Sequence, residues 1–291
     1  MPEVETIRLG LARLLPGRRV AAVDSDWPKS FPNSESDVKH FLIGTEITAV
    51  RRRAKVLIVE LSNEYSLIIH LKMTGQLVFR GADERFGAGH PNDSLVGDLP
   101  DRSTRVTLWF EDGSRLFFND QRKFGWMRLL PDMEIMNLDF FKKVGPEPLG
   151  TDLDAKILQA RAARRGKSNI KSVLLDQTVL AGVGNIYADE ALWGAKIHPA
   201  TLTGELTTGD FKRLYNELVY ILRLSIEKGG STDKNYVDTA GKKGSYLKFA
   251  RVFRREGQPC PRCGTTIIKT RVAGRGTHLC PHCQKPPAGA R

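Results

Sequence analysis

The sequence predicts an α+β chain of several units: a strand-rich N-terminal part, a helical middle part and a small C-terminal module. Three observations predict this class. Short β-type runs separated by turns continue as far as Leu130, which is typical of an all-β sandwich or barrel. Helical spacing of apolar residues begins near Asp152, and all four cysteines lie between Cys260 and Cys283. We expect boundaries at residues 1–135, 136–245 and 246–291, since 291 residues exceed one ordinary core.

The N-terminal part opens with an amphipathic helix. Its apolar residues recur at helical spacing before Pro16-Gly17 ends the pattern; they are Val4, Ile7, Leu11 and Leu14. Strand-like runs then follow at residues 19–23, 46–50, 56–61, 65–70, 76–79, 105–110, 115–118 and 126–130. The segment between Gly81 and Arg102 is rich in Gly, Asp, Asn and Pro, which predicts a long, mobile loop.

The middle part carries helical patterns at residues 155–163, 170–175, 186–193 and 210–225. The segment from Lys228 to Gly244 has little apolar content and many Gly and Lys residues. It predicts a flexible connector or a loop that closes over a ligand.

The charge balance indicates a polyanionic partner. The net charge is +12 and the isoelectric point is near 9.6, which favours duplex nucleic acid, although a generally basic surface is the alternative. No run of 18 apolar residues and no signal-peptide pattern is found. We therefore expect a cytoplasmic protein without membrane partners, and a monomer, because no pattern indicates oligomerisation.

The cysteines form two CxxC pairs, Cys260/Cys263 and Cys280/Cys283, separated by sixteen residues. This spacing predicts one structural Zn²⁺, because four thiolates complete a tetrahedral shell and leave no position for water. A cytosolic redox dithiol is the alternative. Between the pairs, Gly274-Arg275-Gly276 predicts a hairpin tip that presents one arginine to phosphate, or else a solvated tip.

A small-residue turn, residues 182–185, precedes the third predicted helix. Asn185 can cap this helix, and the exposed amides at its start can bind an anion. A phosphate could lie there with Lys171 nearby.

The whole segment 170–199 resembles the helix-two-turn-helix of the formamidopyrimidine-DNA glycosylases. Residues 51–57 resemble the basic hairpin of that family, residues 70–75 its Met-bearing loop and residues 120–125 its Arg-x-Phe-Gly turn. The Gly-Arg-Gly hairpin matches as well, and the order along the chain is the expected one. The resemblance implies an N-terminal β-sandwich flanked by helices, a helix-two-turn-helix domain and a C-terminal four-cysteine zinc finger.

The resemblance also implies a function. A bacterial enzyme of base excision repair is expected, acting on double-stranded DNA that contains oxidised bases or abasic sites. It would excise 8-oxoguanine and formamidopyrimidines through a Schiff base and cleave the strand by β,δ-elimination. The alternatives are an oxidised-pyrimidine glycosylase of the same superfamily and a catalytically inactive protein that binds damaged DNA.

Three residues would fill the gap that a flipped base leaves: Met73, Arg122 and Phe124. An apolar wedge and an aromatic ring can replace lost stacking. From the residues alone, core packing of Met73 and Phe124 and a salt bridge between Arg122 and Asp120 are the alternatives.

The resemblance assigns the remaining contacts to basic and amide side chains. Lys55 would contact the lesion or its phosphate and aid the chemistry, and Arg275 would assist elimination, mainly by its charge. Other residues would hold phosphates around the flipped nucleotide: Lys167, Lys171, Asn185 and Arg275. The loop from Asn235 to Lys248 would fold over the extruded base.

The chemistry is assigned to the N-terminus. Removal of Met1 exposes Pro2 as a secondary amine, and an α-amino pKa near 8 leaves a neutral fraction that can attack the sugar C1′. The resulting iminium is an electron sink that permits strand cleavage. Glu3 can shuttle protons to the sugar oxygen and the leaving group.

The sequence departs from the family in two places. Relatives typically begin Met-Pro-Glu-x-Pro-Glu-Val-Glu-Thr, so Pro2 and Glu3 match either the first or the second Pro-Glu pair. Three helical residues span about 4.5 Å, and a nucleophile displaced that far would miss the sugar, because reacting atoms must approach to about 3–3.5 Å. We therefore hypothesise a start three codons upstream, which mass spectrometry of the native N-terminus tests. Relatives also often carry His-Asp-His where this chain has Ser103-Thr104-Arg105; we expect that phosphate contact to be lost or transferred to Arg105.

Overall fold

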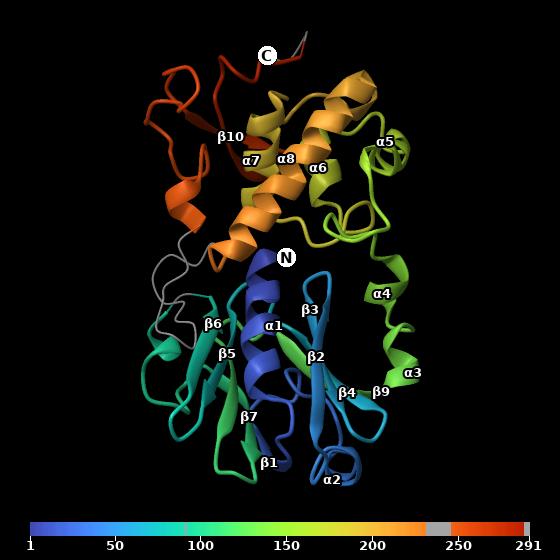
Figure 1. The fold of residues 1–291 in the computed structure, drawn as a ribbon, viewed down its shortest axis with the longest axis vertical. Helices are drawn as coiled ribbons and strands as arrows, with labels where there is room; N and C mark the ends of the chain where they lie inside the picture. The colour runs from blue at the N-terminus through green and yellow to red at the C-terminus, as the bar shows by residue number, and fades with distance from the viewer. Residues whose placement is uncertain (91, 231–245, 288–291) are drawn as a thin grey trace. The chain divides into compact units, whose positions relative to one another are not determined.

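The computed structural model describes residues 1–90, 92–230 and 246–287, which form two compact units (Figure 1). One unit comprises Pro2–Lys142 with the described part of Lys228–Tyr246. The other comprises Met1, Lys143–Glu227 and the described part of Leu247–Arg291. The first is built mainly of strands and the second mainly of helices, so the predicted α+β class is confirmed.

The first unit contains two antiparallel sheets. The five-stranded sheet has the order β1 (Val20–Ser25), β7 (Thr104–Phe110), β8 (Arg115–Asp120), β5 (Gly75–Arg80) and β6 (Arg85–Gly89). The four-stranded sheet has the order β2 (Ile47–Arg53), β3 (Val56–Leu61), β4 (Tyr65–His70) and β9 (Trp126–Pro131). Buried residues of both sheets form one hydrophobic core, because alternate side chains of each strand point inward. The predicted β-sandwich is confirmed.

Helix α1 (Pro2–Leu14) packs against β2, β3 and β6 and adds its apolar face to the same core. It therefore lies along one edge strand of each sheet. Gly10 is required at this contact, because a Cβ there would lie 2.1 Å from the Phe86 ring of β6. The four apolar positions predicted from helical spacing are all buried.

Among the described residues, one strand and three α-helices were not predicted. They are β6, α2 (Glu35–Phe41), α3 (Asp132–Ile135) and α4 (Asp139–Lys143). Strand β6 and the 3-10 helix η1 (Asp93–Leu95) lie inside the segment predicted to be a loop, so that prediction is wrong there. Strand β6 reads Arg-Phe-Gly-Ala-Gly, and two glycines weaken its β pattern. Pairing with β5 over its whole length forms it.

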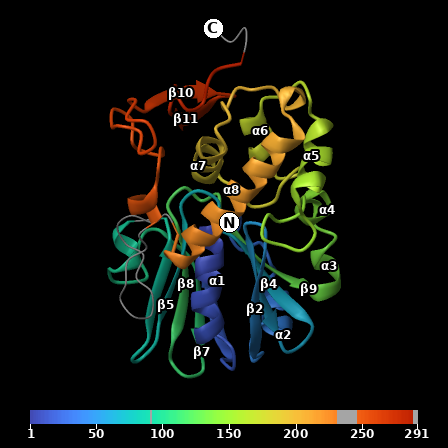
Figure 2. The ribbon, with the colours of Figure 1, turned by 45° about the horizontal axis from the view of Figure 1, so that its top comes forward.

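The second unit contains the four predicted helices. They are α5 (Ala155–Ala163), α6 (Ile170–Leu175), α7 (Asn185–Ala195) and α8 (Thr208–Glu227). Shorter elements are η2 (Thr203–Glu205), η3 (Tyr246–Phe249) and the antiparallel hairpin β10 (Ile268–Val272) and β11 (Arg275–Leu279). Helix α7 packs against α6, α8 and β11 (Figure 2). Among the described residues, none of the helices has the length and apolar character needed to cross a membrane.

Candidate metal centre and nucleic-acid interface

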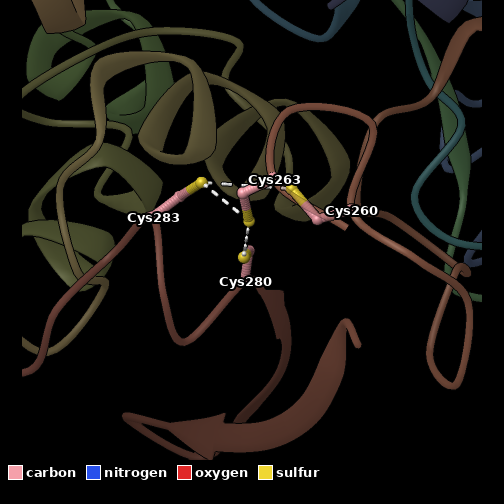
Figure 3. Close-up of side chains that lie close together, drawn as sticks. All are labelled: Cys260, Cys263, Cys280 and Cys283. Atoms are coloured by element: carbon pink, nitrogen blue, oxygen red, sulfur yellow. Dashed lines mark hydrogen bonds between the residues drawn. The ribbon is translucent and has the colours of Figure 1, made fainter. Parts of the chain in front are cut away.

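The four cysteines gather at one point of the second unit. Their sulfur atoms all lie within 4.8 Å of one another, and Figure 3 shows them pointing toward a common centre. The Sγ atoms of Cys263 and Cys280 are 3.5 Å apart, and those of Cys260 and Cys283 are 4.0 Å apart. Four thiolates at Zn–S distances of about 2.3 Å would be separated by roughly 3.8 Å in a tetrahedron. The cluster therefore fits one structural Zn²⁺, as predicted.

The ligand set suits zinc chemically as well. Hydrogen bonds from the side chain and backbone of Thr265 lower the pKa of the Cys263 thiol to about 6, whereas burial raises the pKa of the Cys283 thiol to about 12. The indole N–H of Trp193 donates to Cys260 Sγ at 3.4 Å. Donors to a ligating sulfur orient the ligand and tune the metal. His278 and His282 are not needed, because the four sulfurs complete the shell.

The cysteine module is fixed to helix α7. Trp193 belongs to one hydrophobic cluster with Val252, Cys260 and Ile267, and the guanidinium of Arg262 lies 3.9 Å from the centre of its ring. The fully buried carboxylate of Glu190 accepts the backbone N–H groups of residues 251–253 at 2.8–3.1 Å. Residues 250–283 therefore hold a defined place against α7, and the β10–β11 hairpin with them.

In the first unit, one buried carboxylate fastens two loops together. Asp120, at the end of β8, accepts the backbone N–H groups of Phe124 at 2.8 Å and Gly125 at 2.6 Å. It also accepts the hydroxyl of Thr74 from the loop between β4 and β5. The Met-bearing loop and the Arg-x-Phe-Gly turn, far apart in sequence, are therefore held side by side.

The large apolar side chains on these loops face solvent. Met73 is 67% exposed and Phe124 is 55% exposed, so core packing is the wrong explanation for both. The guanidinium of Arg122 lies 4.8 Å from the centre of the Phe124 ring. The backbone N–H of Arg122, and not its guanidinium, donates a hydrogen bond to Asp120 at 3.3 Å. The structure thus brings together the three residues predicted to fill the gap of a flipped base.

Left-handed backbone occurs immediately before three of the predicted contacts in this unit. The residues before Lys55, Met73 and Phe124 have φ values of 54°, 52° and 59°; they are Ala54, Lys72 and Lys123. Non-glycine residues pay about 1–3 kcal/mol for such a conformation, which persists only where its surroundings enforce it, often at functional sites.

His70 stabilises one of these turns. Its Nδ1 accepts the backbone N–H of Lys72 at 2.9 Å. Burial, together with the charges of Lys72 and Lys55, lowers the pKa of His70 to about 4. The ring is therefore neutral at pH 7 and can accept this bond. The half-buried Lys55 lies near it, at the turn between β2 and β3.

The two N-terminal residues assigned to chemistry begin helix α1. Pro2 is buried and Glu3 is half-buried. Proline suits the first helical position, because its missing N–H has no partner there in any helix.

Two residues predicted to contact phosphate, Lys171 and Arg105, are buried and bonded within the protein. Lys171 is fully buried; its Nζ lies 2.6 Å from Asp189 Oδ1 and donates to Gly276 O and Thr277 Oγ1 at 3.0 and 2.6 Å. The ammonium has three protons, and these three partners use them. Arg105 is 5% exposed and donates to the backbone oxygens of Asp120 and Arg102 and to the Asp26 carboxylate. Neither side chain can reach DNA in this conformation.

Asn185 also differs from its predicted role as a cap. Gly184 is the N-cap of α7, with no side-chain capping bond, and Asn185 is the first helical residue. Its Nδ2 donates instead to Gly276 O at 3.0 Å. Lys167 and Arg275 are exposed, as phosphate-binding residues must be.

The sequence interpretation missed Asp120, Asp189 and Glu190. Two adjacent acidic residues within the apolar helix α7 were a usable signal, because a buried carboxylate needs paired donors. No such sequence signal indicated that the Asp120 carboxylate is buried. Residues 235–245 of the loop predicted to cover the base lie outside the described residues.

Comparison with known proteins places all three parts of the chain in one family. Residues 1–127 match the formamidopyrimidine-DNA glycosylase N-terminal domain, and residues 144–236 match the H2TH domain of the same enzymes. Residues 257–286 match the zinc finger found in FPG and IleRS.

Individual relatives agree over nearly the whole length. The formamidopyrimidine-DNA glycosylase of Pelotomaculum thermopropionicum is 40% identical over 286 residues, and that of Streptococcus thermophilus is 39% identical over 287; both alignments cover 98% of each chain. A solved complex of the Lactococcus lactis Fpg with DNA containing an abasic site has a TM-score of 0.86 at 33% identity, covering 98% of this chain and 99% of that one. A MutM structure with DNA containing carbocyclic 8-oxo-G has a TM-score of 0.84 at 34% identity, with the same coverage.

Proposed function

Because the chain belongs to the formamidopyrimidine-DNA glycosylase family, we propose that it excises oxidised purines from duplex DNA and then cleaves the strand as an AP lyase. The substrates are 8-oxoguanine and formamidopyrimidines. The observation that carries this proposal is the pair of exposed apolar side chains, Met73 and Phe124, on loops that Asp120 fastens together. Solvent-exposed wedges held this firmly suit insertion into a base stack.

The proposed nucleophile is the secondary amine of the N-terminal proline, which is Pro2 once Met1 has been removed, or the proline of the hypothesised upstream start if mass spectrometry finds that longer form. Its nitrogen attacks C1′, the glycosidic bond breaks, and the base leaves with a proton. The iminium forms when the C1′–O4′ bond breaks and O4′ takes a proton. It withdraws electrons from the opened sugar, so that loss of a C2′ proton expels the 3′ phosphate and loss of a C4′ proton then expels the 5′ phosphate. Glu3 carries protons to and from the sugar oxygen and the base.

Lys55 and Arg275 support this chemistry. Lys55 follows the left-handed residue of a tight hairpin, so its backbone is well fixed. It contacts the lesion or its phosphate and can donate a proton. Arg275 acts mainly through its permanent charge, because a guanidinium is a poor acid.

The proposed phosphate contacts come from exposed or half-buried groups of the second unit: Lys167, Asn185 and Arg275. The uncapped start of α7 adds backbone N–H donors beside Asn185. The net charge of +12 supports a polyanionic partner. We place the reaction on chromosomal DNA in the bacterial cytoplasm, carried out by a monomer.

An assay of substrate preference tests this proposal. Single-turnover excision from duplexes with 8-oxoguanine opposite cytosine should be faster than from duplexes with thymine glycol, by about 10-fold or more, which corresponds to roughly 1.4 kcal/mol in the transition state. The reverse order would establish the oxidised-pyrimidine alternative. Binding of both duplexes without excision of either base would establish the inactive DNA-binding alternative.

A further inference from the structure

The strand that carries Arg275 is fastened to the helices of the second unit by polar contacts. Gly276 O accepts from Lys171 Nζ and from Asn185 Nδ2, both at 3.0 Å. The backbone N–H of His278 donates to Asp189 Oδ2 at 3.0 Å. Three residues of α6 and α7 thus hold two consecutive peptide units beyond Arg275.

One chain of hydrogen bonds ends on Arg275 itself. Lys171 Nζ donates to Thr277 Oγ1 at 2.6 Å, and this hydroxyl donates to Arg275 O at 2.9 Å. A hydroxyl can accept and donate at once, and consecutive bonds polarise and strengthen one another. The position of the Arg275 carbonyl therefore depends on a buried lysine of another element.

The charges in this cluster are balanced inside the protein. Lys171 and Asp189 are both 0% exposed and lie 2.6 Å apart. Burial lowers the pKa of Lys171, and the charge of Arg275 lowers it further, whereas Asp189 opposes the fall. Burying such an ion pair costs desolvation free energy. A role in fixing the geometry of the hairpin explains why the pair is present.

We propose that Lys171, Asp189 and Thr277 are positioning residues, which set the place of the Arg275 guanidinium without touching DNA. The residues preceding Arg275 at the hairpin tip, Ala273 and Gly274, have φ values of 50° and 73° and are exposed. The strand beyond Arg275 is anchored to α6 and α7, and the Thr277 hydroxyl bonds the Arg275 carbonyl directly. This inference rests on the proposed function, in which Arg275 stabilises the charge of the reacting nucleotide.

Thr277→Val tests the inference, because it removes the hydroxyl and keeps the branched shape. Displacing a reacting or charge-stabilising group by about 1 Å can cost up to ~100-fold in rate. We expect single-turnover excision of 8-oxoguanine to slow by about 10- to 100-fold. The Kd for uncleavable abasic-analogue duplex and its salt dependence should stay within about 2-fold of wild type, since no phosphate contact is lost. Thr277→Ser retains the hydroxyl and should restore most of the rate.

Thr270→Val is the matched control, because Thr270 pairs with Thr277 across the hairpin but is exposed; it should behave as wild type. Zinc content and thermal unfolding report whether each variant folds. Should Thr277→Val not fold, Asp189→Asn provides a second test, since it keeps the acceptor for His278 N–H but removes the counter-ion of Lys171. It should show the same loss of rate without loss of affinity.

Two results would overturn the inference while wild type remains active. One is a Thr277→Val or Asp189→Asn rate equal to that of wild type. The other is an equal loss of excision rate and of DNA affinity, in which the slope of log binding constant against log salt concentration also falls in magnitude by about one. That result would indicate a direct phosphate contact. Absence of excision by wild-type protein would instead overturn the proposed function.

Discussion

Cys280→Ser is expected to abolish zinc binding and, with it, excision. Cys280 is fully buried, and its Sγ lies 3.5 Å from that of Cys263. Metal binding to a four-cysteine site is worth about 10–16 kcal/mol at pH 7, and that free energy is also folding free energy. Without it the hairpin that presents Arg275 loses its support. The zinc content should fall from one ion per chain to almost none, and the excision rate should fall by at least ~100-fold.

His282→Gln is the matched control for this variant. His282 lies between Cys280 and Cys283 in sequence and is exposed, yet the four sulfurs leave it no coordination position. This variant should retain one zinc and normal excision. A Cys280→Ser protein that kept stoichiometric zinc and wild-type activity would refute the four-thiolate site, and loss of zinc from the His282 variant would refute the ligand assignment.

Lys171→Met is expected to destabilise the second unit strongly. It leaves the Asp189 carboxylate buried and without its counter-ion, which costs about 3–5 kcal/mol. Gly276 O and Thr277 Oγ1 also lose a donor. Thermal unfolding should show a fall in Tm on the order of 10 °C.

The exposed Lys167 provides the comparison, since Lys167→Met makes the same chemical change four residues earlier. The Tm of that variant should lie within about 1–2 °C of the wild-type Tm. Surface substitutions away from caps, the core and buried polar networks change the free energy of unfolding by no more than ~0.5 kcal/mol. Lys171→Met combined with Asp189→Asn should cost less than the sum of the single changes. Equal Tm values for the two lysine variants would show that the buried pair contributes nothing to stability.

Most of the fold could be predicted from the sequence because its longer elements bury a regular apolar face. Strands such as β3 and β4 read as continuous β-type runs, and α1 places its apolar residues at helical spacing. The missed elements lack this property. Helix α2 fully buries none of its side chains, and its two apolar residues, Val38 and Phe41, are only half-buried against the core, so its apolar pattern is too short to predict a helix. Strand β6 depends on its pairing with β5, which no local pattern reveals.

The candidate site could be predicted in position but only partly in detail. Motif resemblance located the loops of Met73 and Phe124, and the CxxC spacing located the zinc ligands, because those residues lie in short local motifs. It failed for Lys171 and Arg105, where a basic residue in sequence looks equally suited to phosphate or to a carboxylate within the protein. Their partners, Asp189 and Asp26, are 18 and 79 residues away in sequence, so only the fold decides between the two.

The account as a whole depends on an N-terminal secondary amine that becomes covalently joined to the sugar of a damaged nucleotide. Borohydride reduction during reaction with an 8-oxoguanine duplex measures this most directly, in a preparation whose first residue has been verified by mass spectrometry. We expect a stable protein–DNA adduct whose modified peptide begins with the N-terminal proline. No adduct, or an adduct on a lysine such as Lys55, would contradict the account.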